Sequence, residues 1–331
     1  MSKIGIIANP TSGKDIRRLV SQALVVGNRE KVNIVKRALI GAFKAGASEI
    51  WIMPDRYGIG NQSIHDLKNR YPEVIDRVSV IEMPLDDSGA DSTRAAEIFR
   101  ERGADCIITL GGDGTVRVSA KGCGDVPLLP ISTGTNNVIP EFIEGTIAGM
   151  AAGFFSATPE NHRMDLLDRQ KRLDVLVNGN LVDSALVDIA VIAGQHVGSR
   201  AVWEPDNVLQ VFVTRAAPTN IGFTSIIGKY QTIKPDDNFG GMALLKEDGK
   251  CCQVQAVIGP GLIYDICIDD FQKMLSGQPI AIVSARPLVL ALDGEREIVL
   301  GDTDVAEIVL NIEGPYFINI DRVMAYTQPA G

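Results

Sequence analysis

The strongest constraint on the fold is a short apolar segment that runs directly into a glycine-rich turn. Residues 106–110 (Cys-Ile-Ile-Thr-Leu) have the composition of a fully buried β-strand, and Gly111-Gly112-Asp113-Gly114-Thr115 follows without a spacer. The residues from Thr115 to about Ala120 then predict a short helix. A buried strand, a glycine turn and a helix start in this order are typical of a βα unit in a parallel sheet.

The rest of the first 150 residues repeats this alternation. Apolar spacing over residues 33–45 and 92–102 predicts two helices, which Gly46 and Gly103 would cap. The other strand candidates before residue 150 are Lys3–Ala8, Glu49–Met53, Val78–Glu82 and Pro127–Ile131. Strands that alternate with helices predict an α/β N-terminal domain with a doubly wound parallel sheet, which we expect at residues 1–148.

Beyond about residue 165 the pattern changes to closely spaced short strands. The apolar runs 173–177 and 181–192 flank Asn178-Gly179-Asn180, which is a hairpin signal. Further strand candidates are Val208–Thr214, Cys252–Val257, Ile280–Val283, Leu288–Leu292, Glu297–Leu300 and Ile308–Ile312. We therefore expect residues 149–331 to form a C-terminal β-rich domain.

Composition and charge exclude several classes of protein. The net charge of −9 disfavours a nucleic-acid binder and stable docking on an anionic membrane. The N-terminus lacks a signal-peptide pattern, and no run approaches the ~18 apolar residues of a membrane span, so we expect a cytoplasmic protein. The five cysteines are odd in number and match no disulfide or zinc spacing, so we expect all of them to be reduced.

Three polar turns each follow a predicted strand, at residues 9–13, 111–115 and 133–137. Ligands of doubly wound sheets bind beyond the carboxyl ends of the strands, so these turns should open on the same edge and form one site. The candidate ligand-binding residues are Asn9, Ser12, Gly13, Gly111, Gly112, Gly114, Thr115, Thr133, Gly134, Thr135, Asn136 and Asn137.

The glycine-aspartate turn is suited to the phosphates of a nucleotide. Glycine allows the backbone N–H groups to approach a phosphate closely, and a following helix N-terminus adds positive potential. Asp113 could hold Mg²⁺ or accept a proton from a hydroxyl group. The alternative is an ordinary βα turn in which the glycines serve only tight packing. Thr133–Asn137 could likewise be a helix N-cap rather than a ligand loop.

Two other motifs are weaker when taken alone. Residues 9–14 invite a P-loop interpretation, which fails because Ala8 and Asp15 stand where that motif needs glycine and Ser or Thr. Asp293-Gly294-Glu295 lies between two predicted strands and is, by itself, a normal hairpin turn.

Taken in order, these motifs resemble the signatures of the superfamily that unites NAD kinases with diacylglycerol and sphingosine kinases. The motifs that carry the resemblance are Asn9–Gly13, Gly111–Thr115, Pro130–Asn136 and Asp293-Gly294-Glu295. Residues 132–137 and Ala201-Val202-Trp203-Glu204 look most like the ATP-NAD kinase-like (AcoX-type) branch, which is associated with bacterial acetoin catabolism.

The resemblance implies an active site in the crevice between the two domains and a C-terminal segment that packs back on the first. Asp113 matches the NAD-kinase Asp that assists the attacking ribose hydroxyl, and Glu295 matches a candidate base of the lipid kinases. Asp188 matches the acid of the pair that grips the NAD ribose, but Val187 stands in place of its Asn. That departure supports nucleotide binding more firmly than NAD as the acceptor.

We therefore expect an ATP- and Mg²⁺-dependent kinase that phosphorylates a hydroxyl on a small molecule, with Asp113 and Glu295 as catalytic residues, Asp113 also as metal ligand and Asp188 at the substrate. By resemblance the acceptor is NAD. The alternatives are a non-catalytic nucleotide-binding sensor and a lipid kinase, which the acidic charge disfavours. The partners expected are a small-molecule or dinucleotide substrate and further copies of the chain in a homo-oligomer, with no nucleic acid and no membrane.

Overall fold

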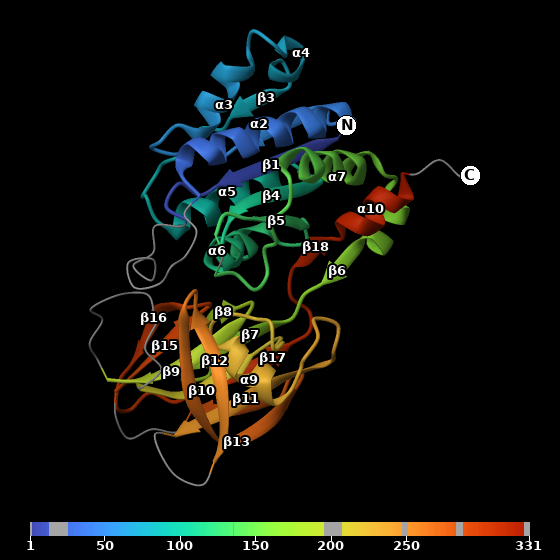
Figure 1. Cartoon of the computed structure of the whole chain (residues 1–331). Helices are drawn as coiled ribbons and strands as arrows, with labels where there is room; N and C mark the ends of the chain where they lie inside the picture. Colours follow the sequence, from blue (N-terminus) through green and yellow to red (C-terminus); the bar gives the residue numbers. More distant parts are fainter. Residues whose placement is uncertain are drawn as a thin grey trace.

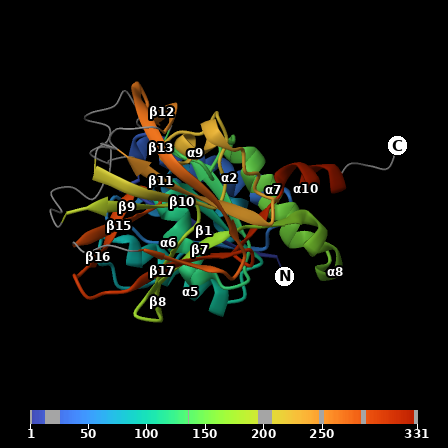
Figure 2. The same ribbon diagram turned by 90° about the horizontal axis from the view of Figure 1, so that it is seen from below.

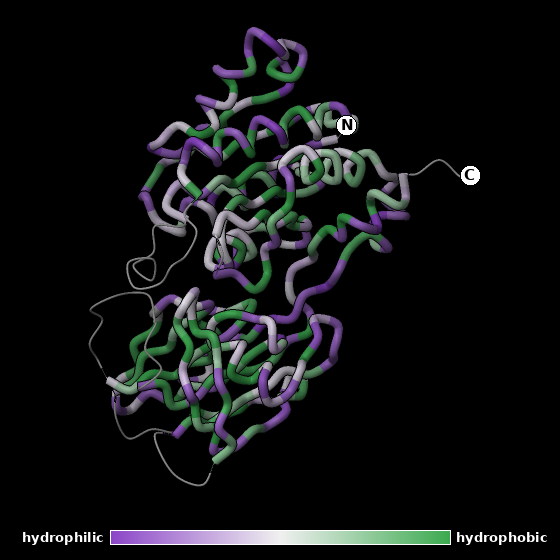
Figure 3. The backbone as a smooth tube through the Cα atoms, viewed as in Figure 1, coloured by the Kyte–Doolittle hydropathy of each residue, from purple (hydrophilic) through white to green (hydrophobic). Residues whose placement is uncertain are grey.

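The computed structural model describes residues 2–12, 26–134, 136–194, 207–246, 251–282 and 287–327, apart from the side chains of residues 296 and 297. An α/β domain lies above a β-rich domain in Figure 1. Hydrophobic segments are concentrated along the strands of both domains in Figure 3. Seen from below, the strands of the β-rich domain lie in front of the α/β domain (Figure 2).

The first domain contains a seven-stranded sheet of order β3-β2-β1-β4-β5-β18-β6. All its neighbouring strands are parallel except β18 and β6. The strands are β1 (Lys3–Ala8), β2 (Glu49–Ile52), β3 (Val78–Val80), β4 (Cys106–Gly111), β5 (Leu128–Ser132), β6 (Leu167–Arg169) and β18 (Tyr316–Ile318). The predicted parallel sheet is confirmed, and the predicted strands before residue 150 lie within a residue or two of their expected positions.

Helices cover both faces of this sheet, as a doubly wound arrangement requires. α2 (Asn28–Lys44) and α7 (Gly145–Ala157) pack on the face that carries Ile4 and Ile108. α5 (Gly89–Glu101) and α6 (Asp113–Cys123) pack on the opposite face. The shorter helices are α3 (Ile59–Leu67), α4 (Pro72–Ile75), α8 (Glu160–Arg163), a 3-10 turn (Met164–Leu166) and α10 (Ile320–Tyr326). No helix in the described ranges is long and apolar enough to cross a membrane.

α7 packs directly against the backbone of α2. Its glycines recur every fourth residue, so they lie on one face. A Cβ on Gly145 would lie 2.7 Å from the Ile34 carbonyl oxygen, one on Gly149 2.1 Å from that of Ala38, and one on Gly153 2.6 Å from that of Ala42. The domain boundary expected at residue 148 falls inside this helix, which belongs to the first domain's helical layer.

The second domain consists of two antiparallel sheets, which confirms the predicted β-rich region. One sheet has the order β12-β13-β11-β10-β9-β15-β16 and the other β14-β17-β7-β8. The strands are β7 (Arg172–Val177), β8 (Asn180–Ala185), β9 (Asp188–Ala193), β10 (Val208–Val213), β11 (Phe239–Lys246), β12 (Cys252–Gly259), β13 (Leu262–Leu275), β14 (Pro279–Ile282), β15 (Leu288–Leu292), β16 (Glu295–Leu300) and β17 (Ala306–Asn311), with helix α9 (Thr224–Tyr230). The run 181–192 is not one strand, because the chain leaves one sheet for the other at residues 186–187.

The expectation that all cysteines are reduced is wrong for one pair. Cys251 and Cys267 form a disulfide, with their Cα atoms 5.6 Å apart. The antiparallel pairing of β12 with β13 brings these residues together, and sequence spacing alone does not reveal that register. Cys106, Cys123 and Cys252 are free.

Two adjacent chain segments connect the domains. The Gln170 N–H donates to the Pro315 carbonyl (2.9 Å), and the Gly314 N–H donates to the Gln170 carbonyl (2.8 Å). After the second crossing, β18 and α10 lie in the first domain (Figure 1). The two crossings therefore form a paired connection beside the junction of the domains.

The close contact of α7 with α2 gives a stability prediction. Gly149→Ala should lower the free energy of unfolding by about 1–3 kcal/mol, because the added methyl overlaps a backbone carbonyl that cannot rotate away. Chemical denaturation measures the change. Gly27→Ala adds the same methyl where nothing lies within 4 Å and should cost much less. Equal stability of the two variants would contradict the packing argument.

Candidate functional site

The glycine-aspartate turn lies at the carboxyl end of β4 and leads into α6. A Cβ on Gly111 would lie 2.3 Å from the Thr115 Cβ, and a Cβ on Gly112 would lie 2.6 Å from the Asn137 Oδ1. Neither glycine has a positive φ. These two glycines therefore make room for the side chains of Thr115 and Asn137, which is the packing role considered above.

The structure brings the three predicted turns into direct contact. The Asn9 side-chain amide donates to the Thr115 hydroxyl at 3.0 Å, and the hydroxyls of Ser12 and Thr133 lie 3.1 Å apart. The Thr133 N–H donates to the Gly111 carbonyl at 3.1 Å. The turns after β1, β4 and β5 thus form one surface. The predicted residues Gly13 and Thr135 lie outside the described residues, as do residues 201–204.

Lys31 supports the first of these turns and was not found from the sequence. Its side chain is fully buried, and its ammonium donates to the carbonyls of Asn9 and Ser12 at 2.8 Å each. A buried ammonium must be paired or hydrogen-bonded, and here two backbone carbonyls meet part of that need. The only sequence signal would have been a lysine among the buried positions of α2.

The third turn is held by its own side chains and caps no helix. The Asn137 amide donates to the Ser132 hydroxyl (2.8 Å) and to the Gly134 carbonyl (3.1 Å). The described residues between Thr133 and Glu144 contain no helix, so the N-cap alternative does not apply there. The Asn136 Oδ1 is buried without a hydrogen-bond partner among the described residues. An unsatisfied buried amide oxygen of this kind is available to a ligand.

Asp113 is the first residue of α6, and its carboxylate is fixed by two backbone groups. Its Oδ2 accepts the Val138 N–H at 2.9 Å and its Oδ1 accepts the Ile139 N–H at 2.8 Å. Burial raises the pKa of Asp113 to about 6, and the charge of Asp293 adds to that rise, whereas the two N–H groups and Arg215 oppose it. Asp113 therefore changes protonation state close to neutral pH.

Asp293 stabilises the point where the chain passes from β8 to β9. It lies with Gly294 in a tight turn between β15 and β16, at φ values of 49° and 84°. Its carboxylate accepts the N–H groups of Leu186 (3.0 Å), Val187 (2.8 Å) and Asp188 (3.1 Å). Burial raises the pKa of Asp293, while Arg117 and these N–H groups lower it.

Glu295, the second predicted catalytic residue, reaches the same junction from the second domain. A Cβ on Gly114 would lie 3.4 Å from the Glu295 Oε1. The carboxylate of Glu295 therefore faces the glycine-aspartate turn. The structure thus places both predicted catalytic residues at one interdomain site, although they are separated by most of the second domain in sequence.

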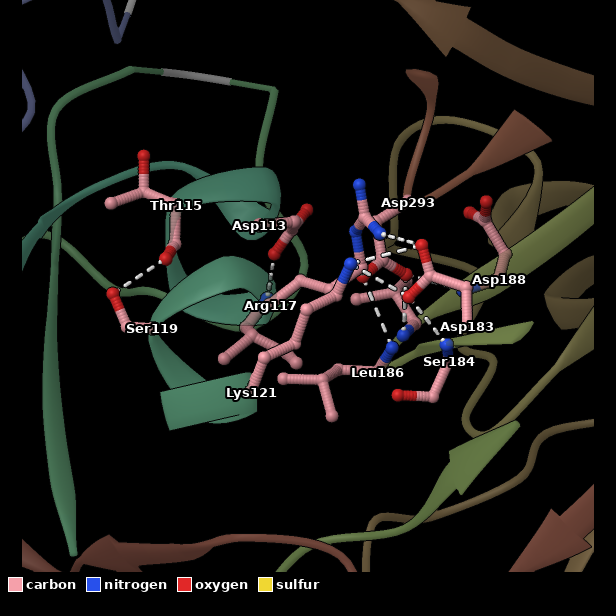
Figure 4. A network of polar contacts seen from close by, with 12 residues as sticks. Asp113, Thr115, Arg117, Ser119, Lys121, Asp183, Ser184, Leu186, Asp188 and Asp293 are labelled. Atoms are coloured by element: carbon pink, nitrogen blue, oxygen red, sulfur yellow. Dashed lines mark hydrogen bonds and ion pairs between the residues drawn. The ribbon is translucent and has the colours of Figure 1, made fainter. Parts of the chain in front are cut away.

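Ion pairs join α6 to the second domain. The Arg117 guanidinium donates to Asp183 (3.2 Å) and lies 3.8 Å from Asp293, and the Lys121 ammonium lies 2.7 Å from Asp183. Figure 4 shows these side chains on the face of α6 that also carries Asp113. Arg117 and Lys121 were not identified from the sequence, and their four-residue intervals from Asp113 along α6 would have been the signal.

Arg215 is a further site residue that the sequence did not reveal. Its guanidinium donates to the Gln170 Oε1 at 2.6 Å, and its buried Nε has no hydrogen-bond partner in the described part of the chain. Burial lowers the pKa of Arg215 to about 10, and the charges of Asp113 and Asp293 oppose that change. Arg215 is therefore a cation close to both buried carboxylates.

The predicted acceptor residue Asp188 begins β9 and is 6% exposed. Its backbone is bonded to Asp293 in both directions, since the Asp293 N–H also donates to the Asp188 carbonyl at 2.9 Å. Val187, which departs from the NAD-kinase pattern, is buried and offers its N–H to Asp293. The structure thus places Asp188 next to Asp293, at the same domain junction as Asp113.

Known proteins resemble both halves of the chain. Residues 4–158 match the ATP-NAD kinase N-terminal domain, and residues 171–313 match the acetoin catabolism protein X C-terminal domain. The acetoin catabolism protein X of Cupriavidus necator is 37% identical over 99% of this chain and 92% of its own length. The NAD kinase of Methanosarcina barkeri is 36% identical over 30% of this chain and 34% of its own length.

A solved structure named "A putative diacylglycerol kinase from Bacillus anthracis str. Sterne" covers 96% of this chain and 98% of its own, at 14% identity and a TM-score of 0.46. The two domain matches occur in the order of the two observed domains. Since the relative from Cupriavidus necator matches nearly the whole chain, the protein belongs to the acetoin catabolism protein X family, with a kinase-like N-terminal domain.

Proposed function

We propose that this protein transfers a phosphoryl group from ATP to a hydroxyl group of a small molecule in acetoin catabolism. The observation that carries the proposal is the meeting of three polar turns with Asp113 and Glu295 at the domain junction. The match to the ATP-NAD kinase domain supports ATP as donor, and the family name of its full-length relative supports the metabolic link.

The turns supply the groups that would position ATP. Gly114 and the start of α6 offer a helix N-terminus, which favours phosphate. The hydroxyls of Ser12 and Thr133 lie 3.1 Å apart on this surface, and the Asn136 Oδ1 in the same loop as Thr133 has no hydrogen-bond partner among the described residues. Phosphoryl transfer depends mainly on positioning and charge stabilisation, so this surface fits the proposed reaction.

Asp113 is the residue that we assign as general base, with Glu295 as the other candidate. Each oxygen of Asp113 accepts one N–H, and a carboxylate oxygen can accept more than one hydrogen bond, so the carboxylate is oriented and still able to bind a hydroxyl. A pKa of about 6 suits a base that works near neutral pH.

Mg²⁺ would be bound by phosphate oxygens and water, with Asp113 as its carboxylate ligand in the alternative in which Glu295 is the base. In the described ranges no group of three or more His, Cys, Asp or Glu could hold a metal ion. Magnesium at nucleotide sites is bound by one or two carboxylates, water and the phosphates themselves. One carboxylate at the glycine-aspartate turn therefore fits a metal that arrives with ATP and neutralises its charge.

NAD is the first acceptor to test, because the kinase-like domain has NAD kinases among its relatives. A second candidate function is nucleotide binding without catalysis. Val187 favours it, because an apolar side chain stands where NAD kinases have an amide, and its N–H is already bound to Asp293. Incubation with Mg-ATP and NAD separates the two, since only the kinase forms NADP.

Asp113→Asn should lower kcat by at least about a hundredfold, because the amide cannot accept a proton in the transition state. ATP consumption in the presence of acceptor measures the effect, and thermal shift with ATP reports whether the nucleotide still binds. Asp125→Asn makes the same change at an exposed position of the loop after α6 and should leave kcat unchanged. Full activity of Asp113→Asn would rule out Asp113 as the base.

The raised pKa of Asp113 predicts the pH dependence of the reaction. A general base must be deprotonated, so kcat/KM should rise with pH through about 6 and level off above it. The pH profile of Glu295→Gln separates the two candidate bases. The acidic limb should remain in that variant if Asp113 is the base, and its disappearance would transfer the assignment to Glu295.

A further inference from the structure

A cavity of about 800 Å³ lies between the domains, next to the Val138 and Ile139 N–H groups that bind the Asp113 carboxylate. The first domain contributes β5, the segment 139–147 and the residues at β18 and α10, and the second domain contributes Arg215, Pro235 and Asp236. Ile139 connects the cavity to the candidate base, because it lines the cavity and its N–H bonds to the carboxylate of Asp113.

The cavity exists because the outer edge of β5 is shared by two partners. Leu128 pairs with Phe317 of β18, whereas Ile131 forms a bridge with Glu141. The Ser132 N–H donates to the Glu141 carbonyl at 2.8 Å, so even-numbered residues of β5 turn their backbone groups toward this edge. Pro130, at such a position, has no N–H to satisfy, which allows a space to open between the two partners.

One wall of the cavity is apolar and accessible to solvent. Phe142 is 60% exposed and Ile147 is 40% exposed, and both line the cavity beside Ile139 and Ile143. Grouped large apolar side chains around a concave space mark ligand sites more often than isolated exposed ones do. This wall fits the apolar body of a small molecule.

The charged groups around the cavity favour a ligand with one negative charge. Arg215 lines the cavity, and the carboxylates of Asp113 and Asp293 lie close enough to act on its charge. Its hydrogen-bond partner is the neutral Gln170, and its buried Nε is unbonded within the described ranges.

A second cation, Arg169, also lines the cavity and stacks on the Tyr316 ring. The exposed acids Glu141, Asp236 and Asp321 line it as well, and these three outnumber the two arginines and would repel a ligand of higher negative charge. The other acids that line it are already paired, Glu144 with Arg37 and Asp168 with Arg322.

We propose that this cavity is a binding site for a singly charged organic anion with an apolar body, in which the anionic group contacts Arg215 and the body lies on Phe142 and Ile147. The site does not depend on the phosphoryl-transfer proposal. A ligand bound there would lie next to Ile139, whose N–H bonds to the carboxylate of Asp113.

The test is isothermal titration of the full-length protein with three probes of one shape. We expect 3-phenylpropanoate to bind, and we expect its neutral amide and the dianion phenyl phosphate to bind at least about tenfold more weakly. Equal binding of the acid and the amide would overturn the role of Arg215. Tighter binding of phenyl phosphate would overturn the assignment to a singly charged anion.

Variants locate the binding site. Arg215→Met should weaken 3-phenylpropanoate by about tenfold or more, whereas Arg215→Lys keeps the charge and should lose less. Arg70→Met, on the exposed surface of the first domain, is the matched control and should bind as the unmodified protein does. Phe142→Ser alters an exposed side chain, so it tests the apolar wall even if Arg215→Met does not fold. Unchanged affinity in Arg215→Met would overturn the role of Arg215, and unchanged affinity in Phe142→Ser would overturn the site even where Arg215→Met does not fold.

Discussion

The site depends on the hydrogen bonds that the buried carboxylate of Asp293 accepts from the backbone. This carboxylate accepts three consecutive N–H groups where the chain passes from β8 to β9, and it lies close to Arg117 of α6. A buried carboxylate without such partners would cost several kcal/mol, so the turn, the strand break and the helix hold one another in place. The first residue of that helix is Asp113, and the position of the candidate base is therefore set partly from the other domain.

The electrostatics of the junction follow from the same arrangement. Burial and the nearby charge of Asp293 raise the pKa of Asp113 to about 6, and burial also raises the pKa of Asp293. Arg117 and Arg215 offset that cost, and burial in turn lowers the pKa of Arg215 to about 10. Two carboxylates and two guanidiniums at the boundary of two domains make the protonation of Asp113 sensitive to the distance between the domains.

The sequence predicted what depends on local pattern. Apolar runs located the strands of the first sheet, and glycine caps located the ends of two of its helices. The position of the polar turns after successive strands predicted that the turns converge. What it missed depends on distant contacts. α7 was overlooked because apolar residues lie all around the helix, so no polar face marks it as amphipathic. The Cys251–Cys267 pair depends on the register of β12 and β13, which no spacing encodes. Arg215 follows β10 and becomes a site residue only where it meets Gln170 of the interdomain connection. The sequence predicted Asp293 only as part of a hairpin turn, whereas its side chain also binds the N–H groups of residues 186–188 on a distant strand.

The signature glycines also need a different explanation from the one that the motif suggests. Gly111 and Gly112 keep space for Thr115 and Asn137, and through these two residues they join the turn after β4 to Asn9 and to Ser132. Their replacement would separate the turns before it disturbed any phosphate. A loss of activity in variants of these glycines would therefore show that the site no longer assembles. A loss of activity in variants of Asp113 or Asn136 would instead show that a group which contacts the ligand is missing. Lys31 holds the Asn9 turn through the carbonyls of Asn9 and Ser12, so a loss of activity in a variant of Lys31 would also report the assembly of the site.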